Sequence, residues 1–255
     1  GEGKFEEAYC FQTGSNQWKT YSSWPPEEAV IKKLFAGANN TCSFTKPAAG
    51  INFVSYISDP TKPVPYRTQP IEATYGPGSR WKPWQVEDQR FVSSRPDVIS
   101  FVMDSLTEDM TVTGKITVHL FASTSGTDAD WIVKLIDVYP DFYQNNYLMS
   151  GYQLPVAMEA FRGRFRKSYS DPTPLTPGKP EEFVIDLHQI NHTFEKGHRI
   201  MIQVQSTWFP LIDRNPQKFV PNIFEAKETD FIKAEQRIYF SSPYPTYIEL
   251  PVMNQ

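Results

Sequence analysis

The chain has 255 residues, which is long enough to bury a hydrophobic core in one large β domain or two ordinary ones. Its formal net charge of -4 gives no basic footprint for nucleic acid, and no run of about 18 apolar residues is present to span a membrane. The 22 prolines against 13 glycines, with 15% aromatic residues, favour many short strands joined by proline-pinned loops over a helical bundle.

The N-terminal part predicts a strand and a turn. We interpret residues 1–5 as a cloning or linker remnant, followed by a single domain over residues 6–252. Tyr9-Cys10-Phe11 predicts a strand, and residues 13–16 predict the turn that follows it. The two cysteines, Cys10 and Cys42, could pair or stay free, and their number alone does not decide between these states.

The segment from Asp59 to Gln89 is the least regular part of the chain. It follows an alternating strand over residues 51–57 and is rich in proline. A long irregular connection inside a compact domain is usually functional or disordered. The aromatic residues Tyr75, Trp81 and Trp84 argue against disorder, because disordered segments contain few of them.

From Asp97 onward the pattern predicts closely spaced strands. They cover residues 98–103, 110–112, 115–122, 131–139 and 160–169, with Gly114 as a hairpin turn between two of them. Residues 131–138 are mostly apolar, as in a strand buried on both faces.

Two further alternating runs, 183–187 and 200–208, flank a turn at Lys196-Gly197. Residues 224–237 have helical spacing, and strands over 237–240 and 247–252 close the chain. The predicted fold is therefore all-β: a jelly-roll β-sandwich with one short C-terminal helix and long loops.

No catalytic constellation is evident in the sequence. Gly-x-Ser-x-Gly, which places a serine nucleophile on a strand-to-helix elbow, is absent, and Ser-x-x-Lys at Ser43 and Ser79 lacks the motifs that accompany it in known enzymes. No spacing typical of zinc or calcium ligands occurs. We interpret the four histidines as hydrogen-bonded loop residues. They are His119, His188, His192 and His198.

Two acidic positions allow a functional and a structural interpretation. Asp128 and Asp130 could bind a cation or could accept backbone N–H groups in a turn, and the turn is favoured. The adjacent Asp213 and Arg214 favour a structural ion pair or loop clamp over a catalytic pair. Three interpretations remain open for the aromatic residues Trp18, Trp24, Tyr75, Trp81 and Trp84. They could pack in the core, dock against another domain or form a platform on which a carbohydrate stacks.

Several stretches together resemble the C-terminal domain of X-Pro dipeptidyl-peptidase and cocaine esterase-like serine hydrolases, closest to the branch of α-amino-acid ester hydrolases and glutaryl-7-aminocephalosporanic acid acylases. The resemblance covers roughly residues 6–252. It is carried by residues 94–101, 112–118, 128–131, 134–141, 192–200 and 209–216, with Gly163-Arg164-Phe165-Arg166 and Pro221-Asn222-Ile223-Phe224 indicating the branch.

The resemblance implies a galactose-binding-domain-like jelly roll that carries no catalytic residues. In that family a separate α/β-hydrolase domain carries the Ser-Asp-His triad, so no catalytic residue, metal or cofactor is transferred to this chain. The domain would pack on that hydrolase domain and help to wall its cleft for a small acyl ester, amide or X-Pro peptide. The wall candidates are Ile71, Tyr75, Trp81 and Trp84, and the structural candidates are Asp130, Asp213 and Arg214.

The resemblance favours export over a cytoplasmic location and leaves homo-oligomerisation open. The alternative hypothesis is a free-standing carbohydrate-binding or other interaction module, because the same fold hosts both uses.

Overall fold

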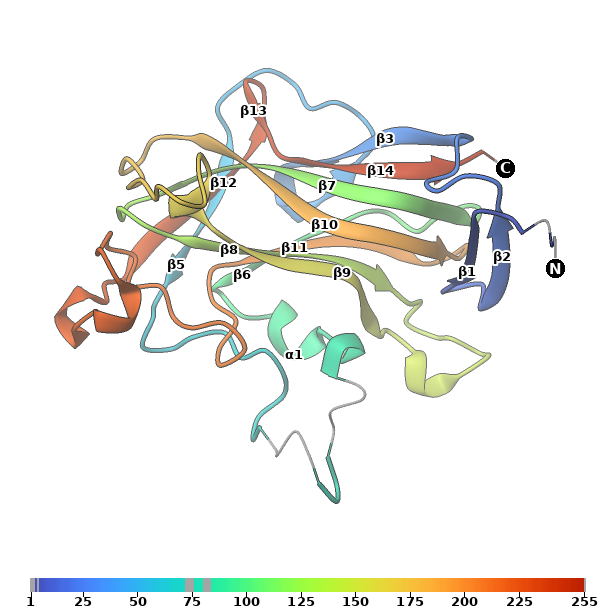
Figure 1. Ribbon diagram of the computed structural model, residues 1–255, viewed down its shortest axis with the longest axis horizontal. Helices are drawn as coiled ribbons and strands as arrows, with labels where there is room; N and C mark the ends of the chain where they lie inside the picture. Colours follow the sequence, from blue (N-terminus) through green and yellow to red (C-terminus); the bar gives the residue numbers. More distant parts are fainter. Residues whose placement is uncertain (1–2, 4, 72–75, 80–83, 255) are drawn as a thin grey trace.

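Two antiparallel β-sheets stacked face to face form the body of the structure (Figure 1). The computed structural model describes residues 3, 5–71, 76–79 and 84–254. The strands are β1 (Ala8–Gln12), β2 (Gln17–Tyr21), β3 (Ala29–Ala36), β4 (Cys42–Ser43), β5 (Phe53–Ser58), β6 (Val98–Val102), β7 (Met110–Thr124), β8 (Asp130–Val138), β9 (Gln153–Arg162), β10 (Glu181–Phe194), β11 (Arg199–Gln205), β12 (Ala234–Ser241), β13 (Tyr244–Pro245) and β14 (Tyr247–Met253).

The helical elements are short. They are the α-helix α1 (Arg90–Ser93) and the 3-10 turns η1 (Ala38–Asn40), η2 (Trp84–Val86), η3 (Tyr147–Met149), η4 (Gly163–Phe165), η5 (Ile223–Glu225) and η6 (Glu228–Asp230). The larger sheet has the order β13-β12-β7-β14-β3-β4, with β10 added on β7 and β5 on β12. The smaller sheet has the order β6-β11-β8-β9, and β1 and β2 form a separate hairpin. The β-sandwich expected from the sequence is confirmed.

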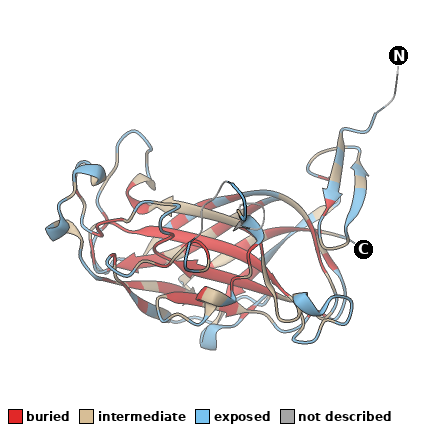
Figure 2. Ribbon diagram, turned by 90° about the horizontal axis from the view of Figure 1, so that it is seen from below, coloured by how far each residue is buried: buried red, intermediate tan, exposed pale blue. Residues whose placement is uncertain are grey.

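The core lies between the two sheets and follows the predicted alternation. In β7, Ile116, Val118 and Leu120 are fully buried. The alternate residues Phe183 and Ile185 of the neighbouring strand β10 are buried beside them on the same face of the sheet. The buried residues form a continuous band through the sandwich (Figure 2). The period of two therefore identified the inward face of both strands correctly.

Strand β8 is buried on both faces, as its apolar sequence predicted. Trp131, Val133 and Leu135 point into the core between the sheets. The alternate residues Ile132 and Lys134 lie on the opposite face, where Tyr66, Gln89 and Trp208 from the connecting segments cover them. Connecting segments thus cover the outer face of the smaller sheet at β8 and shield it from solvent.

Several predicted elements are wrong, beginning with the strand boundaries. Gly114 lies inside the continuous strand β7 at φ +129, where a Cβ would come within 3.1 Å of Pro25 and 3.2 Å of Pro251. The strand expected over 160–169 ends at Arg162, because the chain then turns inward through η4 and buries Arg164. Residues 153–159, which lie between the predicted strands 131–139 and 160–169, belong to the same strand β9.

The helix expected over 224–237 is replaced by η5, η6 and strand β12. Phe224, which began the apolar helical stripe, is 83% exposed and packs against no core. The Asn222 side chain accepts from Phe224 N, and β12 pairs with both β5 and β7. A helix in a protein is stabilised mainly by packing of its apolar face, and the expected apolar stripe has no such partner here. Residues 234–241 instead form hydrogen bonds in the sheet.

Both cysteines are free thiols. Burial raises the pKa of the Cys42 thiol to about 12, so this thiol is protonated at neutral pH. Among the described residues, no helix is long and apolar enough to cross a bilayer.

Candidate functional site

The connection between β5 and β6, residues 59–97, carries all four predicted wall residues. Its described parts extend below the smaller sheet in Figure 1. Ile71 is 38% exposed, and Trp84 begins η2. Tyr75 and Trp81 lie outside the described residues.

The far end of this connection is fastened to the sheet by a buried lysine. The Lys134 ammonium lies 2.8 Å from Gln89 Oε1, 3.1 Å from Gln205 Oε1 and 3.3 Å from Gln203 Oε1. Lys134 is fully buried, and its ammonium also lies 5.5 Å from the centroid of the Trp208 ring. Its three N–H donors therefore meet three amide oxygens, two of which belong to the neighbouring strand β11.

Gln89 links this cluster to the connection itself. Its backbone N–H donates to Gln153 O of β9 at 3.1 Å, and its side-chain amide donates to Glu87 O at 2.6 Å. Its carbonyl accepts from Val92 and Ser93, the first turn of α1. A single residue thus joins β8, β9 and α1 at the point where the connection returns to the sheet. Sequence reasoning missed Lys134, although one lysine inside an apolar strand is a visible signal.

A buried ion pair ties the two arms of the connection together. Arg67 Nε lies 3.6 Å from Glu87 Oε2, and both side chains are almost completely buried. Thr68 Oγ1 donates to the other oxygen of the same carboxylate at 2.5 Å. Residues 67–68 and 87 are separated by about twenty positions in the chain, so this contact closes the base of the loop that contains Ile71.

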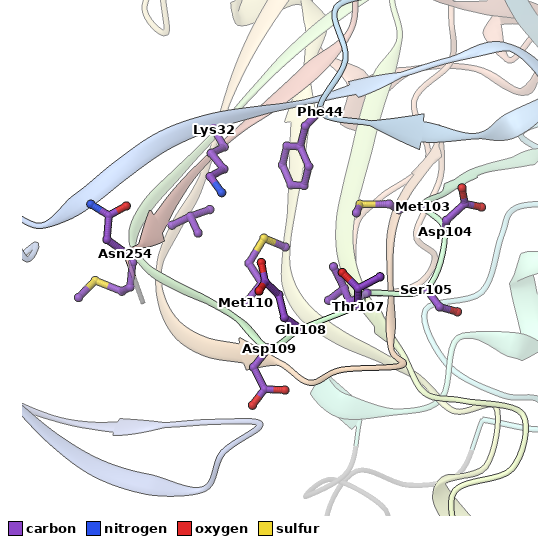
Figure 3. A pocket seen from close by; sticks show the side chains of 13 residues that line it. Lys32, Phe44, Met103, Asp104, Ser105, Thr107, Glu108, Asp109, Met110 and Asn254 are labelled. Atoms are coloured by element: carbon purple, nitrogen blue, oxygen red, sulfur yellow. The ribbon is translucent and has the colours of Figure 1, made fainter.

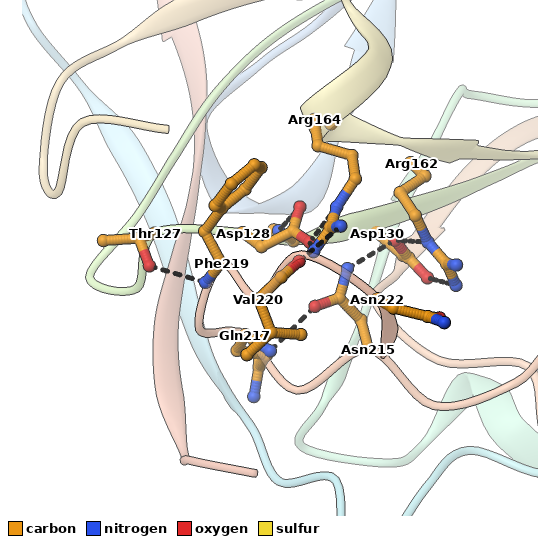
Figure 4. Close-up of polar contacts among 12 residues, drawn as sticks. Thr127, Asp128, Asp130, Arg162, Arg164, Asn215, Gln217, Phe219, Val220 and Asn222 are labelled. Carbon is orange, nitrogen blue, oxygen red and sulfur yellow. Dashed lines mark hydrogen bonds and ion pairs between the residues drawn. The ribbon is translucent and has the colours of Figure 1, made fainter. Parts of the chain in front are cut away.

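The predicted structural residue Asp130 belongs to a second polar cluster (Figure 4). Asp130 accepts two hydrogen bonds of 2.9 Å from Arg162 and one of 2.8 Å from Asn215. Burial raises the pKa of Asp130, and the hydrogen bonds from Arg162 and Asn215 oppose that effect. Its neighbour Asp128 pairs with the buried Arg164 at 2.6 Å. Asp128 also accepts from Ala129 N at 3.0 Å, as the turn interpretation expected, but the main partners of both carboxylates are guanidinium groups.

Asp213 and Arg214 do not pair with each other. Asp213 lies 3.3 Å from Arg162, and Arg214 donates to Pro60 O at 3.0 Å while its guanidinium lies 4.9 Å from the Phe231 ring. Their placement agrees with a loop clamp and corrects the direct ion pair. No group of three or more metal-ligating side chains is found among the described residues.

The loop interpretation of the histidines is wrong for three of the four, because His119 lies in β7 and His188 and His192 lie in β10. His192 lies in β10 and His198 just before β11, and both are 1% exposed. His192 Nε2 is 3.3 Å and His198 Nδ1 is 2.8 Å from the carboxylate of Asp137. Burial alone would raise the pKa of Asp137, but these two hydrogen bonds outweigh it and hold the pKa below its usual value.

A pocket of about 560 Å³ lies away from the connection (Figure 3). Apolar side chains of Phe44, Met103 and Met110 line it, and Asp104 and Glu108 stand on its rim. No histidine is among its lining residues, so no imidazole base stands beside Ser105 there. The histidines of the described chain hydrogen-bond to threonine or carboxylate groups. Among the described residues, no histidine therefore has a serine hydroxyl as its recorded hydrogen-bond partner.

Known proteins share both the fold and much of the sequence. An aminopeptidase from the marine sediment archaeon Thaumarchaeota archaeon is 47% identical, with a TM-score of 0.94, over 96% of this chain and 40% of its own. A selenomethionine-labelled α-amino acid ester hydrolase is 48% identical, with a TM-score of 0.91 and the same coverage. Cocaine esterase of Rhodococcus sp. (strain MB1 Bresler) is 28% identical over 96% of this chain and 41% of the esterase.

The chain therefore spans about two fifths of the length of these relatives. The family model of the X-Pro dipeptidyl-peptidase C-terminal non-catalytic domain matches residues 7–249. The chain belongs to the family of X-Pro dipeptidyl-peptidase C-terminal non-catalytic domains.

Proposed function

We propose that this non-catalytic domain packs on an α/β-hydrolase domain of the same polypeptide and forms one wall of its substrate cleft. The substrate of that hydrolase would be a small acyl ester, amide or X-Pro peptide. The relatives named as aminopeptidase, α-amino acid ester hydrolase and cocaine esterase support this class, since each acts on an ester or peptide bond by its name.

The observation that carries the proposal is the construction of the connection 59–97. Its base is held by two buried polar contacts, Arg67 with Glu87 and Lys134 with Gln89. Ile71, in the part between them, keeps a partly exposed apolar side chain. A fixed base beneath a partly exposed apolar side chain is the arrangement expected of a substrate wall, because a binding surface must be held in place by packed and hydrogen-bonded neighbours. We place the wall at Ile71, Tyr75, Trp81 and Trp84.

The first test asks whether the chain has chemistry of its own. The purified chain is assayed with p-nitrophenyl esters and with Ala-Pro-p-nitroanilide. We expect no turnover, because a weak nucleophile needs a base within hydrogen-bond reach. Turnover that a single substitution within this chain abolishes would contradict the proposal.

The second test uses a chimera in which this chain replaces the matching segment of the α-amino acid ester hydrolase, which is 48% identical. We expect the chimera to be active and Ile71→Asp to raise KM more than it lowers kcat, since a wall contributes binding. Ile57→Asp, at an exposed apolar position in β5, serves as the matched control. Equal effects of the two substitutions would argue against a wall at Ile71.

A further inference from the structure

One face of the N-terminal hairpin is made of exposed aromatic rings. Tyr9 and Phe11 of β1 and Trp18 of β2 are 65%, 42% and 58% exposed. The Tyr9 and Trp18 rings stack at 4.8 Å between centroids, and Phe11 meets Trp18 edge-on at 5.4 Å. They share a face because Phe11 pairs directly with Trp18 and residues alternate between faces. An exposed aromatic cluster of this kind is typical of an interaction surface.

The hairpin is held firmly by its opposite face and its turn. Gln12 is buried and donates to Asn191 Oδ1 at 3.1 Å, and Tyr21 Oη donates to the same oxygen at 3.1 Å. Thr13 exchanges backbone hydrogen bonds with Asn191 O and Thr193 N at 3.0 and 2.9 Å. The aromatic face is therefore presented in a fixed orientation, which lowers the entropy lost when a partner covers it.

A pocket of about 300 Å³ continues this surface toward the proposed wall. Phe11 lines it together with Leu154 and Pro155 of β9, Ile190 of β10 and Val86 of η2. No aspartate, glutamate, lysine or arginine is among its lining residues. Val86 is 44% exposed and lies two residues after Trp84, so the largely apolar surface runs from the hairpin to the end of the connection. A single partner could cover both.

We propose that the α/β-hydrolase domain docks on this surface. It consists of the aromatic face of Tyr9, Phe11 and Trp18 together with the adjoining pocket. The inference rests on the proposed function. In the relatives, about three fifths of the polypeptide lies outside the matched part, and the matching family is described as C-terminal. The N-terminal end of this chain leads directly into the same hairpin (Figures 1 and 2). A domain joined there lies within reach of this face.

The chemistry of the surface fits such a partner. Interfaces between domains are depleted in charge at their centre and enriched in aromatic side chains. A polyanion or an anionic membrane would instead require a basic patch, and the pocket is lined by no lysine or arginine. The hydrolase surface that meets this face should accordingly offer apolar side chains to Trp18 and Tyr9.

The experiment is hydroxyl-radical footprinting of the isolated chain and of the chimera described above, with both shown to be folded by circular dichroism. We expect labelling of Tyr9 and Trp18 to fall about tenfold in the chimera, as for residues at the centre of an interface. Tyr169 and Phe224, which are 82% and 83% exposed, are the matched controls and should be labelled equally in both. η5, which contains Phe224, lies at the end of the sandwich opposite the hairpin (Figure 1).

Each outcome separates this inference from the proposed function. Unchanged labelling of Tyr9 and Trp18 in an active chimera overturns the docking surface and leaves the wall intact. Protection in a folded but inactive chimera supports the docking surface and counts against the wall. Unchanged labelling in a folded, inactive chimera overturns both.

Two measurements on the isolated chain test whether a second copy of the chain or a carbohydrate covers this surface instead. Sedimentation that shows a dimer with Tyr9 and Trp18 already protected would assign the surface to a second copy and overturn the proposal. Saturable quenching of tryptophan fluorescence by oligosaccharides, lost in Trp18→Ala, would assign it to carbohydrate and overturn it as well. A monomer with flat titrations is the expected result. In the chimera, Trp18→Ala should then convert one cooperative unfolding transition into two, and Phe224→Ala should not.

Discussion

The ammonium group of Lys134 donates a hydrogen bond of 2.8 Å to the side-chain oxygen of Gln89, joining the most buried strand of the smaller sheet to the end of the connection 59–97. Lys134 is completely buried, and the oxygens around it belong to neutral amides. A buried charge costs free energy unless hydrogen bonds compensate it. The lysine is thus suited to fixing the connection in place.

Lys134→Met should loosen the base of the connection. Amide hydrogens of residues 85–93 should exchange faster, because Gln89 loses its partner on β8, and exchange in β7 should stay unchanged. Lys46→Met, at an exposed position, is the control. Equal protection of residues 85–93 in wild type and Lys134→Met would show that the lysine does not hold this segment.

The same lysine should make stability depend on pH. Burial lowers the pKa of Lys134 from 10.5 to about 7 in the folded state. Between these values the unfolded state binds more protons at Lys134, so the free energy of unfolding should rise with pH from about 7 to 9, by up to about 1.4 kcal/mol per pH unit. Above pH 9 the buried Cys42, whose pKa is raised from 9.0 to about 12, opposes this rise. Urea titrations across this range check the slope, which Lys134→Met should remove and Lys46→Met should keep.

The carboxylate of Asp137 holds His192 and His198 together. Asp137→Asn should lower the free energy of unfolding by about 2 kcal/mol, as expected when hydrogen bonds to a buried carboxylate are weakened. Because the pKa of Asp137 is lowered in the folded state, its contribution is present above the ordinary aspartate value of 3.8 and is lost as pH falls below it. Urea titrations at pH 7 and in acid measure both effects. Asp141→Asn, whose side chain is 92% exposed, should change little.

The turn of the N-terminal hairpin lies directly on β10. A Cβ at Gly14 would lie 1.9 Å from Thr193 O, and its φ is +81. Gly14→Ala should therefore destabilise the protein by about 3 kcal/mol or more and increase proteolysis at the hairpin. Gly78→Ala separates the two causes, because Gly78 has φ +80 with no atom within 4 Å and should cost only about 1 kcal/mol. Similar losses for both variants would exclude the steric contact as the cause.

The pair of Asp128 and Arg164 can be tested by a double-mutant cycle. Arg164→Met alone should cost about 3–5 kcal/mol, because it leaves the fully buried Asp128 without its cation. The double variant Asp128→Asn with Arg164→Met should recover part of this loss, since no unpaired charge remains. Strictly additive losses in thermal or urea unfolding would contradict a direct interaction.

The sequence by itself determined the β-sandwich and the faces of its strands. Alternation in residues 115–122 and 183–187 predicted which side chains are buried, because a pleated strand points them to opposite sides whatever its partner. The sequence also sufficed to show that it contains no Gly-x-Ser-x-Gly motif and that its motifs resemble those of the family. The helix expected over 224–237 was wrong because helical spacing does not state whether any surface will cover the apolar stripe.

Only the tertiary structure decided what the charged residues do. Asp137 meets histidines 55 and 61 positions away, and Lys134 meets Gln89 at a distance of 45 positions. Asp213 and Arg214 are adjacent in the chain but contact different partners, Arg162 and Pro60 O. The physical reason is that periodicity is a local property of the backbone, whereas the partner of a buried charge depends on how sheets and loops pack across the whole chain.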